Sequence, residues 1–185
     1  QDDQGMIFEL LRSKMYADPA GSICREVASN SRDANREVGK GTTPIKISII
    51  APNEMLNISD LSISFEDEGP GISPQRMTDV FLKYAASTKR STNQFTGGFG
   101  LGAKTPFAYT DIFHIITVSE GVKYHYLAYI DETRVGKVSQ LSTAKTTEVN
   151  GTKIIVPVQP KDRQRFEQSV ITATTFWDVK PILKN

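Results

Sequence analysis

The chain has 185 residues, of which 38 % are hydrophobic and 23 % are charged, and its formal net charge is +1. These values are typical of one globular domain with a sizeable core, and the single cysteine, Cys24, excludes a disulfide framework. The near-neutral charge excludes a global attraction to nucleic acid, and no apolar run reaches the ~18 residues of a membrane-spanning helix.

The first part of the chain combines helical and strand patterns. Apolar residues at helical spacing predict an amphipathic helix over 6–15. A cap residue followed by proline, and glycines at the far end, predict a second helix over 18–37. Alternating apolar and polar residues predict strands over 45–50 and 61–65. This order favours a mixed architecture of helices and strands.

The remainder begins with a predicted helix over 73–84, capped by a Ser-Pro pair, and a long polar loop over 87–99. Loops of that length inside one domain are usually functional. A short helix is predicted over 102–109, and a last helix opens at Pro160. Four more strands are predicted over 112–118, 122–130, 137–141 and 152–158.

Three polar residues of the second predicted helix are spaced to lie on one face. Glu26, Asn30 and Asp33 are separated by four and then three residues, which stacks them over two turns. A solvated polar face is one explanation. A bound ligand is the other, because a half-buried carboxylate beside an amide needs a partner such as a hydrated cation.

A second candidate segment follows the second predicted strand. Asp67 ends that strand, and Gly69 and Gly71 come directly after it. Glycines at this spacing let a flat ligand approach the backbone, and a carboxylate there can accept a hydrogen bond from an exocyclic amine. The alternative is a simple acidic turn.

The third candidate segment is 97–102, Gly-Gly-Phe-Gly-Leu-Gly, directly before a predicted helix. Free backbone amides at a helix start suit anions, phosphates in particular. A P-loop is excluded because Ala103 separates the last glycine from Lys104. The dinucleotide fingerprint is excluded because Thr105 stands where its third glycine is needed.

In this order, the three segments resemble the motifs of the GHKL ATPase superfamily, which includes gyrase B subunits, ninety-kilodalton heat-shock chaperones, MutL proteins and sensor histidine kinases. The matching stretches are 25–34, 67–72 and 97–102. The stretch 151–154 resembles the late family strand whose threonine supports the adenine-binding aspartate. The stretch 84–89 is similar to a segment of MutL proteins that approaches the nucleotide phosphates.

Within the superfamily, the run 97–111 is most similar to phage rapid-lysis A proteins, the lysis-inhibition factors of large tailed phages, with support from 126–131 and 155–158. This likeness implies one ATP-binding domain over 1–185 that forms the N-terminal module of a longer protein. It also implies a location in the host cytoplasm, a phage or host protein as partner, and scope for peripheral membrane association. Because hydrolysing relatives commonly complete their site with a lysine or arginine from a following domain, slow turnover by this module alone is expected.

The resemblance further implies an α+β fold, a two-layer sandwich of the Bergerat type whose mixed sheet carries helices on one face. The nucleotide would lie between the layers under a lid formed by 87–99. The implied function is Mg²⁺-dependent binding and hydrolysis of ATP to ADP, with the nucleotide state controlling lid closure and homodimer formation.

The roles of the family's residues pass to the matching positions. Glu26 would polarise the water that attacks the γ-phosphate, and the amide oxygen of Asn30 would bind Mg²⁺. Asp67 would accept a hydrogen bond from adenine N6, with Thr152 in the same polar cluster. The other residues implied in ATP binding are Asp33, Ala34, Gly69, Gly71, Ile72, Ser87, Thr88, Lys89, Gly97, Gly98, Phe99, Gly100, Leu101, Gly102 and Lys104, of which the two lysines are candidate partners of phosphate charge.

Other activities of the superfamily are alternatives. A histidine kinase would need a phosphoacceptor histidine, and the only histidines, His114 and His125, lie in predicted strands after the third motif. Since hydrolysing relatives have a residue like Glu26, an ATPase is favoured and both histidines are interpreted as structural.

Two further alternatives remain open. One is an ATP sensor that does not hydrolyse the nucleotide but uses it to recruit a partner. The other is a DNA-transacting ATPase of the MutL or gyrase type, whose basic cluster would be Lys161, Arg163 and Arg165. A solvated helix face explains that cluster better, so nucleic acid is not the favoured partner.

Overall fold

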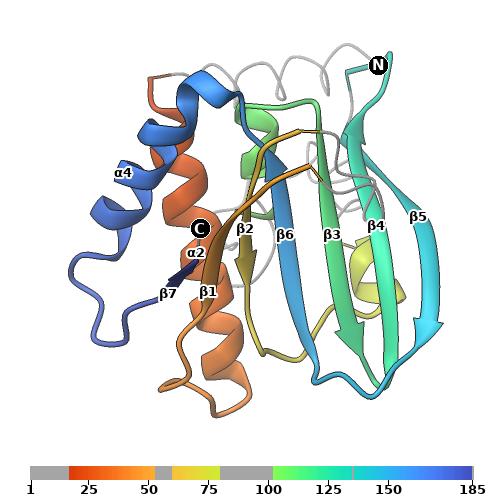
Figure 1. Cartoon of the computed structure of the whole chain (residues 1–185). Coiled ribbons are helices and arrows are strands. Elements are labelled where there is room, and N and C mark those ends of the chain that lie inside the picture. The colour runs from red at the N-terminus through yellow and green to blue at the C-terminus, as the bar shows by residue number, and fades with distance from the viewer. Residues whose placement is uncertain (1–16, 53–59, 80–101, 135, 185) are drawn as a thin grey trace, which may run out of the picture.

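A computed structural model describes four stretches of the chain, 17–52, 60–79, 102–134 and 136–184. The predicted helix over 6–15 and the predicted lid over 87–99 lie outside these stretches. Two larger helices and a mixed sheet make up the described part (Figure 1).

The sheet has seven strands among the described residues, in the spatial order β5-β4-β3-β6-β2-β1-β7. Neighbouring strands pair antiparallel throughout, except that β7 runs parallel to β1. The strands are β1 (Lys46–Ile50), β2 (Ser62–Glu66), β3 (Ile112–Ser119), β4 (Val122–Ile130), β5 (Gly136–Lys145), β6 (Gly151–Pro157) and β7 (Ile182–Lys184).

Helix α2 (Pro19–Glu37) begins where the sequence predicts, with Asp18 as its cap. The Asp18 carboxylate accepts a hydrogen bond from the Gly21 amide at 3.0 Å, which satisfies one of the free amides of the first turn. Helix α4 (Arg163–Thr174) packs beside α2, and the 3-10 helix η3 (Gly102–Ala108) also contacts α2. A single turn, η4 (Pro160–Asp162), leads into α4.

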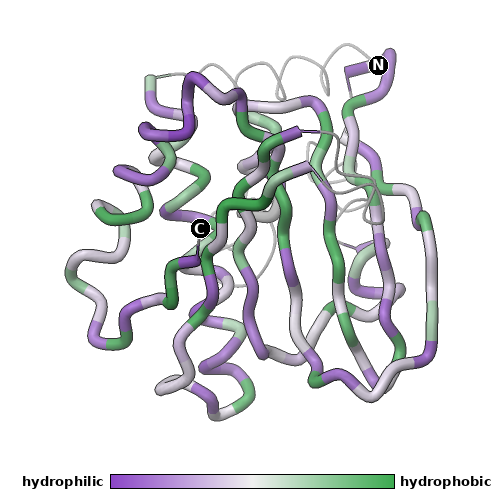
Figure 2. Tube along the Cα trace, viewed as in Figure 1, coloured by the Kyte–Doolittle hydropathy of each residue, from purple (hydrophilic) through white to green (hydrophobic). Residues whose placement is uncertain are grey.

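The core lies between these helices and one face of the sheet. Strand side chains alternate, so that Ile63 and Phe65 of β2 face their neighbours Val156 and Ile154 of β6 on the buried side. Figure 2 shows hydrophobic segments within β1 and β3 of the same sheet. Full burial of such a side chain contributes roughly 1.5–3 kcal/mol, and Phe166 of α4 is one of these residues with no exposed surface.

Most predicted elements are present with ends shifted by one or two residues. Residues 74–79 are helical, and the Ser73 hydroxyl caps them by accepting from the Arg76 amide at 3.3 Å. Strand β5 is longer than predicted, α4 ends three residues before Trp177, and β7 was not predicted at all. In the described stretches, no helix is both long enough and apolar enough to cross a bilayer.

Two glycines with positive φ give a matched test of the packing. Gly71 has φ of +74°, and a Cβ there would collide with the backbone carbonyl of Val118 in β3. Gly39 has φ of +77°, but its Cβ would meet nothing within 4 Å. We therefore expect Gly39→Ala to cost about 1 kcal/mol of unfolding free energy and Gly71→Ala at least ~3 kcal/mol. Urea denaturation measures both, and equal losses would contradict the close approach to β3.

Candidate functional site

The first two sequence motifs are brought into direct contact by α2 and the segment after β2. A Cβ at Gly69 would lie 2.6 Å from the Cβ of Ala34, so the segment approaches the helix as closely as glycine permits. The glycines at 69 and 71 were expected to make room for a flat ligand. In the structure, the space beside Gly69 is occupied by Ala34 and that beside Gly71 by Val118, so both glycines are needed for packing within the protein itself.

Asn35 fixes this contact, and the sequence analysis missed it. Its side chain is 1 % exposed, and its Oδ1 accepts a hydrogen bond from the Glu68 amide at 2.7 Å. Its Nδ2 donates to the carbonyl of Thr43 at 3.0 Å. The side-chain amide of Asn35 therefore ties the end of α2 to the loop that follows the helix and to the segment after β2. Asn35 lies two residues after the last member of the polar stripe, and no local pattern marks it because its partner at Glu68 is distant in the chain.

Asp67 lies at the end of β2 and is 7 % exposed. Its Oδ1 accepts hydrogen bonds from the backbone amides of Gly69 and Thr152, both at 3.0 Å. Burial raises the pKa of this carboxyl to about 7, although these two amides and a hydrogen bond from the Ser31 side chain on α2 act in the opposite direction. Ser31, also buried, was not singled out by the sequence analysis.

Thr152 and Ile72, two of the residues implied in nucleotide binding, meet at a third residue that the sequence did not reveal. The hydroxyl of Thr117 in β3 accepts from the Ile72 amide at 2.8 Å and lies 3.2 Å from the Thr152 hydroxyl. It also donates to the carbonyl of Gly151 at 3.0 Å. Strand pairing places Thr117 opposite Thr152, which no local pattern in the sequence could indicate.

The polar stripe of Glu26, Asn30 and Asp33 lies on α2, the helix that contacts the segment after β2. Glu26 is exposed and Asn30 is half-buried, and neither side chain forms a hydrogen bond or ion pair with the residues that the structure describes. Asp33 is exposed and its Oδ1 lies 3.4 Å from Arg36 and 3.7 Å from Arg32. Among the described residues, the stripe therefore offers one carboxylate and one amide a turn apart without side-chain partners, whereas the third member is paired with arginines.

The third motif is only partly described. Gly102 begins η3, and Lys104 within η3 is 7 % exposed. Burial lowers the pKa of Lys104 to about 7, so a nearby anion would favour its charged form. The other candidate residues of this region lie outside the described stretches; these are Ser87, Thr88, Lys89, Gly97, Gly98, Phe99, Gly100 and Leu101.

The two histidines lie in strands, as predicted, and bond to each other. Nδ1 of His114 in β3 is 2.9 Å from Nε2 of His125 in β4. Burial lowers the pKa of both rings, that of His114 to about 4, which keeps them neutral. Within the described stretches, no group of three or more His, Cys, Asp or Glu side chains is arranged to hold a metal ion.

The buried carboxyl predicts a specific dependence of stability on pH. Because the pKa of Asp67 is about 7 in the folded chain and 3.8 ordinarily, the folded chain binds its proton more tightly. Its contribution to stability is thus present at low pH and is lost as pH rises from about 4 to 7. In Asp67→Asn, the amide oxygen still accepts from both backbone amides but does not titrate.

We therefore expect the stability of Asp67→Asn relative to the parent to increase as pH rises from 5 to about 7, by ~1.4 kcal/mol for each pH unit, and to level off above pH 7. The opposite dependence from His114, whose pKa is lowered, is common to both proteins and cancels in the difference. Urea denaturation at several pH values measures this difference, and a constant difference would contradict the buried ionisable carboxyl.

The comparisons with known proteins identify the family of the chain. The chain matches the family described as histidine kinase-, DNA gyrase B-, and HSP90-like ATPase over residues 21–156, which span the first motif through β6. A comparison with curated proteins gives no match. The mixed seven-stranded sheet with its helices is the α+β fold expected for this family. With the match covering most of its length, the chain belongs to the histidine kinase-, DNA gyrase B- and HSP90-like ATPase family.

Proposed function

We propose that this domain binds ATP together with Mg²⁺ and hydrolyses the γ-phosphate. The observation that carries the proposal is the contact between α2 and the segment after β2. This contact sets a buried carboxylate, Asp67, beside a helix whose stripe presents the exposed carboxylate of Glu26 and the half-buried amide of Asn30.

Asp67 is the proposed contact for the adenine base. Both of its backbone hydrogen bonds end on Oδ1, so acceptor capacity remains on the carboxylate for a donor from the ligand. The exocyclic amine of adenine is such a donor, whereas guanine has a carbonyl at that position. A buried carboxylate gains most from a donor of this kind because water does not compete for it.

Asn30 and Glu26 are proposed to act at the phosphate end. The Asn30 oxygen suits Mg²⁺, a hard ion that binds oxygen ligands, and a single protein oxygen leaves room for phosphate oxygens and waters. When bound, the ion neutralises charge on the phosphates. Glu26 lies one turn earlier and is exposed, and its proposed role is to orient a water and accept its proton.

The remaining features of the proposal come from sequence likeness. The glycine-rich motif and the lid over 87–99 would hold the phosphates, with Lys89 and Lys104 as charge partners. Nucleotide-driven lid closure and homodimer formation are supported only by the superfamily resemblance. A role in phage lysis inhibition within the host cytoplasm is supported only by the resemblance of 97–111, with 126–131 and 155–158.

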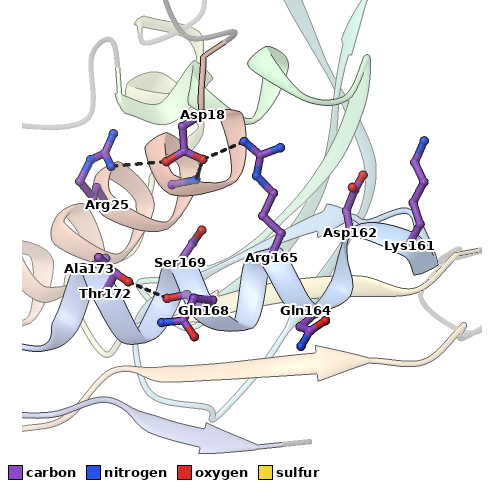
Figure 3. Close-up of a pocket in the computed structure, with 11 residues that line it drawn as sticks. Asp18, Arg25, Lys161, Asp162, Gln164, Arg165, Gln168, Ser169, Thr172 and Ala173 are labelled. Carbon is purple, nitrogen blue, oxygen red and sulfur yellow. Dashed lines mark hydrogen bonds and ion pairs between the residues drawn. The ribbon is translucent and has the colours of Figure 1, made fainter.

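A DNA-transacting role is the weaker candidate because both arginines of its basic cluster are paired with carboxylates. Arg163 lies 2.8 Å from Glu167, and Arg165 lies 3.3 Å from Asp18. Figure 3 shows the Asp18 carboxylate between Arg165 and Arg25 at a hollow lined by α2 and α4. These carboxylates offset much of the charge that would attract a phosphate backbone.

The adenine contact is tested by Asp67→Asn. The variant has no carboxylate to accept a charge-assisted hydrogen bond from the base, and its NH₂ group is a donor. The free energy of ATP binding should therefore weaken by ~1.5–3 kcal/mol, about ten- to a hundredfold in affinity. Isothermal titration calorimetry with ATP, ADP and GTP measures this. Unchanged ATP affinity, or equal wild-type affinity for ATP and GTP, would argue against the contact.

The catalytic role is tested by Glu26→Ala in the full-length natural protein. We expect ATP affinity within about twofold of the parent and a hydrolysis rate at least ~100-fold lower, since a positioned general base typically contributes 10²–10⁴-fold. Glu37→Ala, which removes another exposed glutamate from the same helix, is the matched control.

Steady-state and single-turnover assays separate the outcomes of this test. Normal turnover by Glu26→Ala would show that the base is assigned wrongly. If the parent itself leaves bound ATP intact in a single-turnover assay, the domain is an ATP sensor and not an ATPase.

A further inference from the structure

The hydroxyl of Thr117 controls the direction of a hydrogen bond inside the proposed base pocket. Thr117 is fully buried in β3, and its Oγ1 has three polar neighbours. The carbonyl of Gly151 lies at 3.0 Å, the amide of Ile72 at 2.8 Å and the hydroxyl of Thr152 at 3.2 Å. These are as many partners as one hydroxyl can serve, because it has one proton and two lone pairs.

One assignment of protons satisfies all three neighbours of Thr117 at once. A carbonyl can only accept, so the proton of Thr117 points at Gly151. A backbone amide can only donate, so one lone pair of Thr117 receives the Ile72 amide. The second lone pair is left for the third neighbour, so in this assignment Thr152 is the donor to Thr117; the 3.2 Å contact by itself allows either direction.

The consequence is that Thr152 can only accept from a ligand. Its backbone amide donates to Oδ1 of Asp67 at 3.0 Å, so the threonine and the carboxylate are immediate neighbours. An ionised carboxylate is also an acceptor only. A ligand group with two N–H donors would satisfy both acceptors, whereas a carbonyl oxygen facing them would be repelled.

We propose that Thr117 is a positioning residue for base specificity: by holding the proton of Thr152, it makes the pocket accept an amine and reject a carbonyl. This inference rests on the proposed binding of an adenine nucleotide at Asp67. It adds a residue that does not itself touch the base but determines what Thr152 presents to the base.

The test compares ADP with inosine diphosphate, which carries a carbonyl in place of the amine. Both nucleotides lack a γ-phosphate, so neither is hydrolysed there. Calorimetry with Mg²⁺ gives the ratio of the two dissociation constants. In Thr117→Val, the hydroxyl of Thr152 is free to rotate and donate to the carbonyl. We expect the preference for ADP to fall about five- to tenfold, as one redirected hydrogen bond allows.

Two matched variants separate positioning from simple damage to the fold. Thr117→Ser keeps the hydroxyl and should restore the parent's preference. Thr174→Val removes another buried threonine hydroxyl, one that bonds to the Val170 carbonyl within α4, and should leave the preference unchanged. A merely structural role for Thr117 would weaken both nucleotides equally, so an unchanged ratio in folded Thr117→Val overturns the inference.

A second variant keeps the test decisive if Thr117→Val does not fold. Thr152→Val removes the proposed second acceptor, so ADP should bind about fivefold more weakly while inosine diphosphate changes less than twofold. An unchanged ratio would again overturn the inference. If the parent binds ADP but these ratios do not move, only the role of Thr117 is wrong; if the parent binds no adenine nucleotide, the proposed function is wrong as well.

Discussion

The contact between α2 and the segment after β2 is the constraint on which the site depends. Gly69 allows that segment to lie against Ala34, and Asn35 holds it there through the Glu68 amide. As a result, Asp67 is buried under the same helix that carries Glu26 and Asn30. A side chain at Gly69 would push the two motifs apart, and the base and phosphate ends of the proposed site would lose their relative positions.

The burial of Asp67 makes this site costly in the absence of a ligand. Burial raises the pKa of this carboxyl to about 7, which means that the folded chain favours the neutral form and that ionising the group costs free energy. The two backbone amides on Oδ1 lower that cost, and a donor from a ligand would lower it further. Perturbed pKa values of this kind are typical of functional sites, where a loss of folding stability keeps a group positioned for its ligand.

Sequence patterns predicted the elements of the fold well because most depend on local information. Asp18 and Pro19 mark the start of α2, and strict alternation marks β1 and β2. The three-residue strand β7 was missed because its Ile-Leu-Lys sequence is exposed and short, and only its pairing with β1 defines it as a strand.

The residues of the candidate site divide in the same way. Glu26 and Asn30 could be found from helical spacing, and Asp67 from its place at a strand end. Thr117 and Asn35 could not, because their roles arise from partners 35 and 33 residues away in the chain. The packing role of Gly69 and Gly71 could not be predicted either, since their protein neighbours come from α2 and β3; their expected part in ligand approach stays a prediction.

The central claim is that these distant segments form one nucleotide site. A crystal structure of the protein grown with ADP and Mg²⁺ tests it most directly. The account predicts that the adenine amine lies within hydrogen-bonding distance of Asp67 and that the Asn30 oxygen faces the metal. A base bound elsewhere on the domain, or Asn30 turned away from the phosphates, would contradict it.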